Sequence, residues 1–409
     1  MTRPPEPSRR TGVLALAAYA AFLVYQSLAG GGAWSCGDAV LVASARPSRA
    51  DLLANMVAYL PLGVLVVHAA TRGAAARGPR LAMRIAGGVL LIAALSLAME
   101  LLQVCLAARV SSAYDVVANT IGGVVGAAIA LGSRSLSGNL RTRGNAGVTL
   151  VDPRLRGLTV GVAAVWVAAQ AAPWVFSLDV GTVRANLSFL RHWSDAPPLD
   201  AWRVVRHAGA WLAVACACRL VAADRRVAVA SVLGVGAVSI ILQVLIDAQA
   251  PLSVEELGGM AIGVASALPL LGVSGRAPRG RRWAMAMACG ALLSVAAYEL
   301  RPDPIGAAAR AFSWWPLVGL GGPLGALDYA LLFGWFGFTA VVAAQWAGRD
   351  GVAHAPRSWP AVAVLTTLVF ELLQTRIAGR GPDVSAPLFT LLAVLATTAC
   401  LPAADDGAA

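Results

Sequence analysis

Lysine is absent from this sequence, and charged residues of any kind are scarce. Aspartate, glutamate and arginine together make up 13 % of the 409 residues, whereas hydrophobic residues make up 58 %. The mean hydropathy is +0.71. Soluble globular domains carry about 25 % charged residues, so this composition excludes that class. The chain is predicted to be an integral membrane protein.

Histidine and cysteine are too few and too scattered to indicate a metal centre. The four histidines show no ligand spacing with one another or with the six cysteines, whereas zinc sites place their ligands at short, regular intervals. No metal and no cofactor are therefore predicted. Cys36 lies in a loop after the first apolar run, and the other cysteines lie within apolar runs, where we interpret them as small buried hydrophobic residues. These five are Cys105, Cys216, Cys218, Cys289 and Cys400.

Twelve apolar runs are long enough to cross a membrane as helices. A hydrocarbon core of about 30 Å requires roughly 17 to 25 helical residues, at ~1.5 Å per residue. The fold is therefore predicted to be an all-α polytopic membrane protein with twelve transmembrane helices. The runs lie near 12–32, 52–71, 84–108, 114–133, 157–176, 202–221, 226–248, 254–273, 282–300, 325–347, 359–378 and 384–403.

The net charge of +11 comes from 32 arginines against 21 acidic residues. This charge could serve a nucleic-acid partner or set the membrane topology. If the N-terminus is cytoplasmic, 21 arginines fall in inner segments, nine in outer loops and two inside a helix. Positive residues gather on the cytoplasmic side, so we predict a multi-pass protein with both termini in the cytoplasm and no nucleic-acid partner. The first run also fits a cleaved signal peptide, but its equivalence with later runs favours a membrane span.

One polar pattern occurs three times along the chain. The run Glu-Leu-Leu-Gln at 100–103 returns at 371–374, each time with an arginine six residues after the glutamine. In the middle of the chain, Glu255 follows Gln243 by twelve residues, the interval that separates the glutamine and the aspartate of the first copy. An even number of spans gives each copy the same orientation. We therefore predict three parallel four-helix repeats, at 11–140, 155–275 and 280–405.

The third and fourth predicted helices of the first repeat carry polar side chains on faces that can meet. Glu100 and Gln103 are three residues apart, and Asp115 and Asn119 are four apart, so each pair lies on one face of its helix. A short loop containing Arg109 joins the two helices near the outer surface. The candidate polar site comprises Asn55, Glu100, Gln103, Arg109, Ser112, Asp115 and Asn119.

Two interpretations of these polar groups stay open. In the structural one, the arginine pairs with the aspartate, and the other groups form hydrogen bonds across helix interfaces. In the functional one, the groups form a binding or catalytic site. A carboxyl group in hydrocarbon costs about 2.5–3.5 kcal/mol, and ionisable residues within the membrane usually mark a function. The convergence of six polar positions on one region favours the functional interpretation.

The ordered motif resembles that of the VanZ-like family of bacterial membrane proteins, named for a teicoplanin-resistance determinant. "DLLANMVAYLPLG" precedes Glu-x-x-Gln, an arginine and "DVVANTIGG", all within the first third of the chain. The resemblance implies a four-span α-helical domain in the bacterial cytoplasmic membrane, a link to lipoglycopeptide resistance or envelope metabolism, and no assigned catalytic activity. The family's marked positions correspond to Asn55, Pro61, Gly63, Glu100, Gln103, Arg109, Asp115, Asn119 and Gly122.

The other two repeats depart from this motif. In the second, Ile240, Gln249 and Gly259 replace the glutamate, the arginine and the asparagine, so that repeat is predicted to be mainly architectural. In the third, Asp383 aligns with Ser112 of the first. The partial third site comprises Glu371, Gln374, Arg380 and Asp383.

Three functions fit these observations. The favoured one is a site, open to the outer leaflet of the lipid bilayer, for an amphiphilic envelope molecule: a lipid-linked glycan, a phospholipid or a lipoglycopeptide. Arg109 would receive an anionic group of that molecule. If a reaction takes place, Glu100 or Asp115 is the candidate general acid or base, but no nucleophile stands out and no enzymatic activity is assigned. The alternatives are a non-catalytic scaffold for envelope proteins and a proton-coupled transporter, which the apolar inner halves of the helices disfavour.

Overall fold

The structure, a computed structural model, is α-helical throughout the residues that it describes. In that part of the chain there are thirteen α-helices, one 3-10 helix at Ser188–Leu190 and two isolated β-bridges. The described residues are 9–28, 34–36, 48–71, 78–106, 111–142, 153–172, 174–175, 179–190, 199–222, 225–246, 252–271, 279–302, 308–318, 323–348 and 358–401.

Each of the twelve predicted apolar runs overlaps one long helix, and the remaining helix, α6, is a short segment between α5 and α7. The helices are α1 (Arg9–Leu28), α2 (Arg49–Thr71), α3 (Pro79–Gln103), α4 (Ala113–Thr142), α5 (Pro153–Gln170), α6 (Val180–Asn186), α7 (Ala201–Val221), α8 (Arg225–Leu245), α9 (Val254–Leu271), α10 (Arg279–Glu299), α11 (Pro323–Ala347), α12 (Trp359–Gln374) and α13 (Ser385–Cys400).

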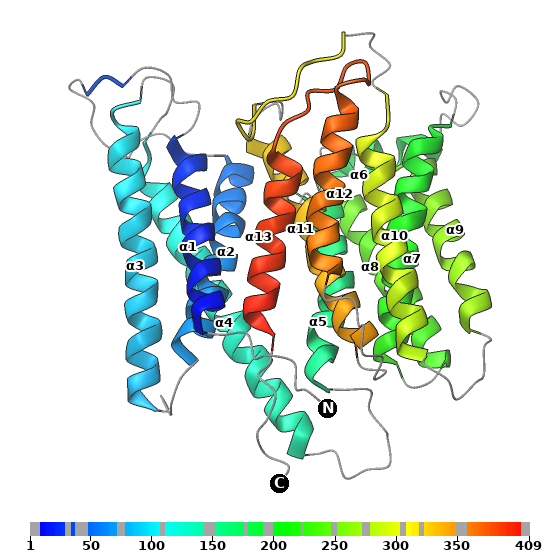
Figure 1. The fold of residues 1–409 in the computed structure, drawn as a ribbon, viewed down its shortest axis with the longest axis horizontal. Helices are drawn as coiled ribbons and strands as arrows, with labels where there is room; N and C mark the ends of the chain where they lie inside the picture. The colour runs from blue at the N-terminus through cyan, green and yellow to red at the C-terminus, as the bar shows by residue number, and fades with distance from the viewer. Residues whose placement is uncertain are drawn as a thin grey trace. The chain divides into compact units, whose positions relative to one another are not determined.

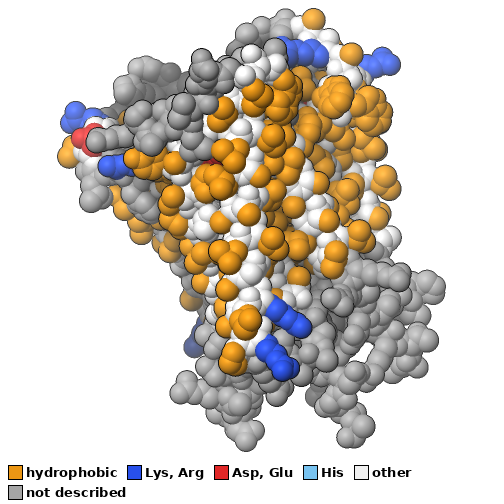
Figure 2. Space-filling model, turned by 90° about the vertical axis from the view of Figure 1, so that its left-hand side faces the viewer, with side chains coloured by type: hydrophobic (Ala, Val, Ile, Leu, Met, Phe, Trp, Pro, Cys, Tyr) orange, Lys and Arg blue, Asp and Glu red, His pale blue; other side chains and the backbone are white. Residues whose placement is uncertain are grey.

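Six of these helices are long and apolar enough to cross a membrane: α2, α3, α4, α7, α8 and α11. Their outward side chains suit lipid, as Leu90 and Leu91 of α3 and Ile129 of α4 illustrate, because each is more than half exposed. Figure 2 shows hydrophobic side chains over the middle of one face, with arginines toward its ends. The all-helical membrane class is therefore confirmed, and the full set of twelve spans stays a prediction.

The chain divides into two compact units. Unit 1 comprises Met1–Leu140 and Leu395–Ala409, and unit 2 comprises Arg141–Val394. Within unit 1, α1, α2 and α3 pack against one another (Figure 1). Their shared core contains Leu23, Leu62 and Ile92, together with Tyr59. The three predicted repeats divide the chain differently, because 280–405 has residues in both units, and they stay a prediction.

In unit 1, α2 and α4 approach so closely that their backbones touch. A Cβ atom at Gly122 would lie 2.1 Å from the carbonyl oxygen of Met56, and one at Gly126 would lie 2.0 Å from that of Leu60. Small residues four apart allow such crossings in membranes, where van der Waals packing drives the association of helices. The crossing brings the polar first turns of α4 next to the polar face of α2.

Unit 2 is built around α7, which packs against α5, α8, α9 and α10. Nearly every residue of α7 from His207 to Cys218 is buried. Large aromatic side chains fill the space between α5 and α11, where the Trp335 indole N–H donates to the carbonyl oxygen of Val162 over 2.9 Å. A buried indole N–H usually finds such a partner, and this bond fixes α11 against α5.

Candidate functional site

The polar face of α3 is buried inside unit 1. Ser96, Glu100 and Gln103 are spaced at four and three residues, and their exposed fractions are 0 %, 4 % and 8 %. The lipid-compatible residues Leu97, Leu101 and Leu102 lie between them and are exposed. This alternation at helical spacing directs the carboxyl and amide groups inward and the leucines outward.

The Glu100 carboxylate contacts the beginning of α4. The backbone N–H of Ser112 donates to Glu100 Oε2 over 2.7 Å, and the Ser111 hydroxyl donates to the Glu100 carbonyl oxygen over 2.8 Å. The Ser112 hydroxyl oxygen in turn accepts from the backbone N–H of Tyr114. A carboxylate is well placed at a helix N-terminus, where backbone N–H groups lack partners and the helix dipole is positive.

A second polar contact joins α3 and α4 deeper in the unit. The Asn119 side-chain amide donates to the Ser96 hydroxyl oxygen over 2.9 Å. The Tyr59 hydroxyl of α2 makes a weak hydrogen-bonding contact with the Ser96 side chain and interacts electrostatically with Glu100. At the rim, the Asn55 side chain of α2 interacts with the half-buried Asp115 carboxyl group. The residues of the site thus come from three helices of one bundle.

Three polar atoms of this cluster are buried without a hydrogen-bond partner of normal geometry among the described residues. They are Tyr59 Oη, Asn119 Oδ1 and Asp115 Oδ1. Tyr59 and Asn119 are themselves only 4 % and 6 % exposed. Buried polar groups are nearly always paired, so these three atoms are free to form hydrogen bonds with a bound molecule.

The structure does not place all the predicted site residues in one contact network. The Gln103 amide donates to the carbonyl oxygen of Ser27, at the end of α1, over 2.8 Å. Asp115 contacts Asn55, whereas Glu100 contacts Ser112. Arg109 lies outside the described residues.

Sequence reasoning missed two members of the site. Tyr59 follows Asn55 by four residues on α2, and Ser96 precedes Glu100 by four residues on α3. The same helical spacing that relates Asp115 to Asn119 could have found both of them. Tyrosine and serine are less conspicuous in an apolar run than carboxyl groups, which explains why they were overlooked.

A disulfide bond joins Cys36 to Cys105 beside the site. The neighbouring backbone N–H of Ser35 donates to the Cys105 carbonyl oxygen over 2.8 Å. These contacts hold the segment after α1 against the end of α3, two residues beyond Gln103. This finding corrects the interpretation of Cys105 as a small buried hydrophobic residue. Of the remaining four, Cys216 and Cys218 are buried, Cys400 is partly exposed and Cys289 is exposed.

Unit 2 contains a cluster of carboxyl groups around the predicted third-repeat residues. Glu371, Gln374 and Asp383 are buried, and the backbone N–H of Asp383 donates to Glu371 Oε2 over 3.0 Å. Sequence reasoning missed two partners, Glu299 of α10 and Tyr329 of α11. The Tyr329 hydroxyl lies 2.7 Å from Glu371 Oε1 and 3.1 Å from Glu299 Oε1. The repeated sequence pattern does not include Glu299, so it could not predict that the end of α10 lies against α12.

Arg380 faces backbone oxygens beside this cluster. Its guanidinium donates to the carbonyl oxygens of Tyr298 and Glu299, the latter over 3.0 Å. The same guanidinium lies 5.4 Å from the centre of the Tyr298 ring, and that of Arg206 lies 4.8 Å from it. These cation–π contacts compensate for part of the cost of burying two positive charges.

The second-repeat region holds a smaller polar cluster. The Gln243 amide donates to Glu256 Oε1 over 2.7 Å, and the Gln170 amide donates to the same oxygen over 3.0 Å. Glu256, the residue after Glu255, is therefore the acid that meets Gln243. The Glu255 side chain lies apart from this cluster and accepts from the backbone N–H of Asp200 over 3.5 Å.

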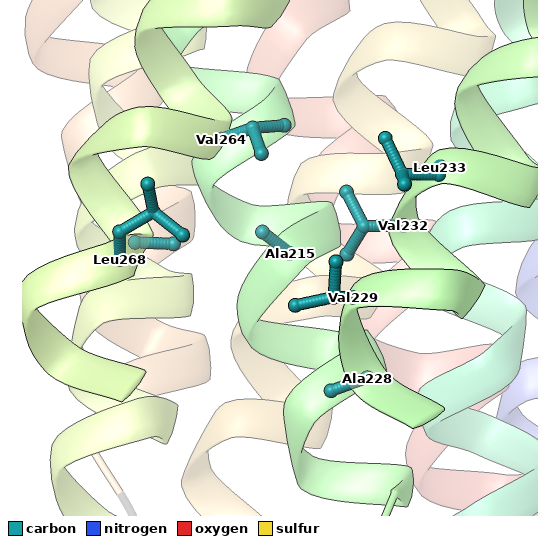
Figure 3. A pocket seen from close by; sticks show the side chains of 8 residues that line it. Ala215, Ala228, Val229, Val232, Leu233, Val264 and Leu268 are labelled. Carbon is teal, nitrogen blue, oxygen red and sulfur yellow. The ribbon is translucent and has the colours of Figure 1, made fainter. Parts of the chain in front are cut away.

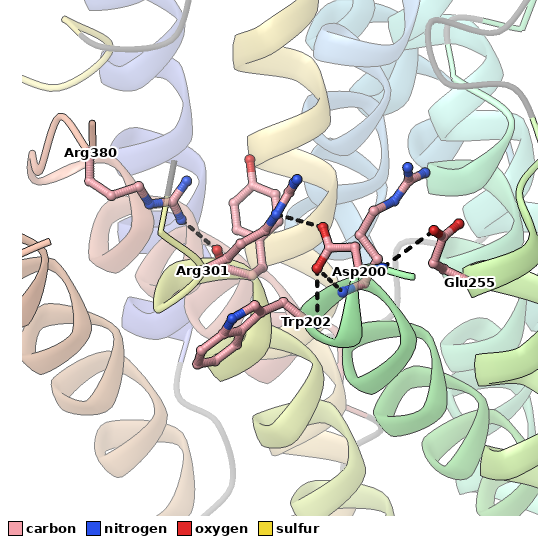
Figure 4. Close-up of polar contacts among 7 residues, drawn as sticks. Asp200, Trp202, Glu255, Arg301 and Arg380 are labelled. Carbon is pink, nitrogen blue, oxygen red and sulfur yellow. Dashed lines mark hydrogen bonds and ion pairs between the residues drawn. The ribbon is translucent and has the colours of Figure 1, made fainter. Parts of the chain in front are cut away.

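Asp200 lies between Glu255 and Arg301 at the beginning of α7 (Figure 4). Its carboxylate accepts from the backbone N–H groups of Trp202 and Arg203, and it forms an ion pair with Arg301 over 2.8 Å. The pair is partly exposed, so its contribution to stability is about 1 kcal/mol or less. This contact is that of a helix cap, and it does not indicate a binding site.

An apolar cavity of about 40 Å³ lies between α7, α8 and α9. Its eight lining residues are all alanine, valine or leucine, including Ala215, Val232 and Leu268 (Figure 3). The side chains that line the cavity have no polar group that could bind the polar part of a ligand. The candidate site is therefore the polar cluster of unit 1. Among the described residues, no group of three histidine, cysteine, aspartate or glutamate side chains could hold a metal ion.

Comparison with known proteins identifies one part of the chain. Residues 16–134 match the VanZ/LLP1 family model. The match covers α4 as far as residue 134 and includes every residue of the unit 1 cluster, together with both disulfide-bonded cysteines. No curated protein and no solved structure matches the chain.

Proposed function

Since residues 16–134 form a domain of the VanZ-like family, we propose that this membrane protein binds an amphiphilic cell-envelope molecule at the polar cluster of unit 1. The observation that carries the proposal is the set of unpartnered buried atoms, Tyr59 Oη, Asn119 Oδ1 and Asp115 Oδ1. An unsatisfied buried polar group costs about 1–3 kcal/mol, which a bound polar molecule would offset. The apolar outer faces of α3 and α4 keep the site within reach of lipid.

The chemistry of these atoms favours a ligand rich in hydroxyl or amide groups. Asn119 Oδ1 and Asp115 Oδ1 are acceptors, and the Tyr59 hydroxyl both donates and accepts. A glycan or a peptide head group supplies the matching donors, and Arg109 of the adjoining loop would receive an anionic group. A lipid-linked glycan or a lipoglycopeptide meets these requirements. Binding of the latter would connect the chain to teicoplanin resistance.

We propose that the site faces the outer side of the bacterial cytoplasmic membrane, with both termini in the cytoplasm. The Cys36–Cys105 disulfide supports this orientation, because disulfides form and persist in oxidising compartments outside the cytoplasm. Cys36 follows α1 and Cys105 follows α3, so both lie on the side opposite the N-terminus. The arginine distribution supports the same orientation independently.

We further propose that 155–275 and 280–405 are two altered copies of the VanZ-like helix group. The contacts of the first copy recur between α12 and α13, where Asp383 takes the place of Ser112 and donates its N–H to the glutamate twelve residues earlier. Gln374 donates to a carbonyl oxygen at the end of α10, in the way that Gln103 donates to one at the end of α1. In the second copy, Gly259 and Gly263 of α9 meet carbonyl oxygens of α7 as Gly122 and Gly126 of α4 meet those of α2.

The test of the binding proposal is a titration of the full-length chain, in lipid nanodiscs, with teicoplanin and with a bacterial membrane lipid extract. Bound molecules are identified by mass spectrometry. We expect Tyr59→Phe and Asp115→Asn each to weaken retention of the ligand about fivefold or more, the worth of one hydrogen bond of about 1 kcal/mol. Tyr114→Phe is the matched control, because Tyr114 is 44 % exposed. Equal retention by all three variants and the wild type would overturn the proposal.

A further inference from the structure

Two glutamates of unit 2 share a single hydroxyl group. Glu299 ends α10 and Glu371 lies on α12, and their side chains are 0 % and 1 % exposed. The Tyr329 hydroxyl of α11 lies between them, 3.1 Å from Glu299 Oε1 and 2.7 Å from Glu371 Oε1. Both distances are within hydrogen-bonding range, so three helices meet at one oxygen atom.

The two hydrogen bonds between Tyr329 and the glutamates need two protons, and the tyrosine hydroxyl supplies only one. A phenol carries one proton and can donate to only one of the two carboxylates. If both glutamates were ionised, the lone pairs of the tyrosine oxygen would face a carboxylate oxygen with no proton between them. Two hydrogen bonds require one glutamate to be protonated, so that it donates to Tyr329 while Tyr329 donates to the other glutamate.

The other oxygens of the two carboxyl groups are already acceptors. Gln374 donates its side-chain N–H to Glu299 Oε2, and the backbone N–H of Asp383 donates to Glu371 Oε2 over 3.0 Å. The additional proton therefore belongs on an Oε1 atom, facing Tyr329. Either glutamate can hold it, because reversing both hydrogen bonds moves it from one side to the other.

The surrounding charges favour retention of this proton. Asp383 is 3 % exposed and interacts electrostatically with both glutamates, and its Oδ2 has no hydrogen-bond partner among the described residues. Arg380 donates to the backbone carbonyl of Glu299. From α7, Arg206 interacts with Tyr298 and with Asp328, a further acidic residue of α11. Glu299, Glu371 and Asp383 are thus three buried acidic residues beside one guanidinium, that of Arg380. A bound proton reduces the net negative charge of this cluster.

We propose that Glu299, Tyr329 and Glu371 form a proton-binding site that joins α10, α11 and α12. The bound proton completes the hydrogen bonds between the three helices, and its release leaves two buried carboxylates repelling each other across Tyr329. The site lies in unit 2, outside residues 16–134, and it does not depend on the proposed function of unit 1.

Infrared spectroscopy of the full-length chain in nanodiscs tests the proposal, because a protonated carboxyl group has a C=O stretching band that a carboxylate lacks. Near neutral pH we expect the wild type to show this band and to shift it in deuterated buffer. Glu299→Gln and Glu371→Gln should each abolish it, since the remaining glutamate accepts the Tyr329 proton and needs none of its own. Glu255→Gln, at the partly exposed rim, is the control and should retain the band.

Two results would overturn the proton site: absence of the band from the wild type, and its persistence in either glutamine variant. A second measurement covers the case in which a variant fails to fold. The folded chain holds a proton that the unfolded chain releases, so the melting temperature of the wild type should fall as the pH rises from mildly acidic to neutral. Glu371→Gln, which leaves only one of the two carboxyl groups, should reduce this fall, and an unchanged pH dependence would contradict the proposal.

Discussion

The backbone N–H of Ser112 donates to Glu100 Oε2 over 2.7 Å, so the Glu100 side chain of α3 binds the backbone just before α4. Asp383 and Glu371 of unit 2 stand in the same relationship over 3.0 Å. In both places a glutamate near the end of one helix binds the backbone just before the next helix. The glutamate of the Glu-x-x-Gln motif therefore has a structural role beside any role in binding.

The first prediction separates these roles at Glu100. Glutamine retains an acceptor oxygen for the Ser112 N–H, so Glu100→Gln should keep the free energy of unfolding within about 1 kcal/mol of the wild type. Glu100→Leu leaves that buried N–H unsatisfied and should lower the free energy of unfolding by about 1–3 kcal/mol. Denaturation in detergent, followed by circular dichroism, measures both. Equal stability of the two variants would show that the contact with Ser112 contributes little.

The second prediction concerns the crossing of α2 and α4. A methyl group at Gly126 would lie 2.0 Å from the carbonyl oxygen of Leu60, whereas one at Gly132 of the same helix meets nothing within 4 Å. Gly126→Ala should therefore destabilise unit 1 by about 1–3 kcal/mol through overpacking. Gly132→Ala should be neutral or stabilising by up to about 1 kcal/mol, because alanine favours the helix.

Thermal unfolding of the two glycine variants is compared in one experiment. The comparison separates a loss of stability caused by the helix crossing from one caused by any glycine-to-alanine substitution in α4. If both variants melted at the same temperature, the close approach of α2 and α4 would be refuted. The pair also tests why the site residues meet, since Asn119 and Gly126 belong to the same helix, α4.

The third prediction concerns the disulfide and the topology together. In intact cells, Cys36→Ser should free Cys105, which a membrane-impermeant maleimide would then label from outside, whereas the wild-type pair should react only after reduction. Loss of a native disulfide typically costs about 2–5 kcal/mol. Because helices inserted in a membrane stay partly ordered when packing is lost, we expect a cost at the low end of that range. Labelling of both wild-type cysteines without reductant would contradict the bond.

The helices were largely predictable from the sequence, and the contacts between them were predictable only in part. Apolar length sets the position of a membrane helix, so each predicted run overlaps an observed helix. Which residues face inward on one helix follows from spacing, as Glu100 and Gln103 illustrate. The helix that these residues face does not follow from spacing, because tertiary packing decides it. Gln103 binds the end of α1, and Glu371 binds Tyr329 of α11.

Two differences have specific physical reasons. The acid that meets Gln243 is Glu256, one residue after the Glu255 of the repeated pattern, and a step of one residue, which turns a helix by roughly 100°, cannot be resolved by an interval measured across a loop. The Cys36–Cys105 bond joins residues 69 apart in the sequence. Apolar surroundings made Cys105 resemble a core residue, although the residue lies just past the end of α3, on the same side of the membrane as Cys36.

The most direct test of the account is the teicoplanin susceptibility of bacteria that express the chain at matched membrane abundance. Tyr59→Phe removes only a buried hydroxyl that makes no hydrogen bond of normal geometry, so the protein should fold as well as the wild type while its effect on susceptibility is reduced. Tyr114→Phe, which changes an exposed hydroxyl on α4, should behave like the wild type. If expression of the wild type lowers susceptibility and Tyr59→Phe lowers it equally at equal abundance, the polar cluster of unit 1 is not the binding site.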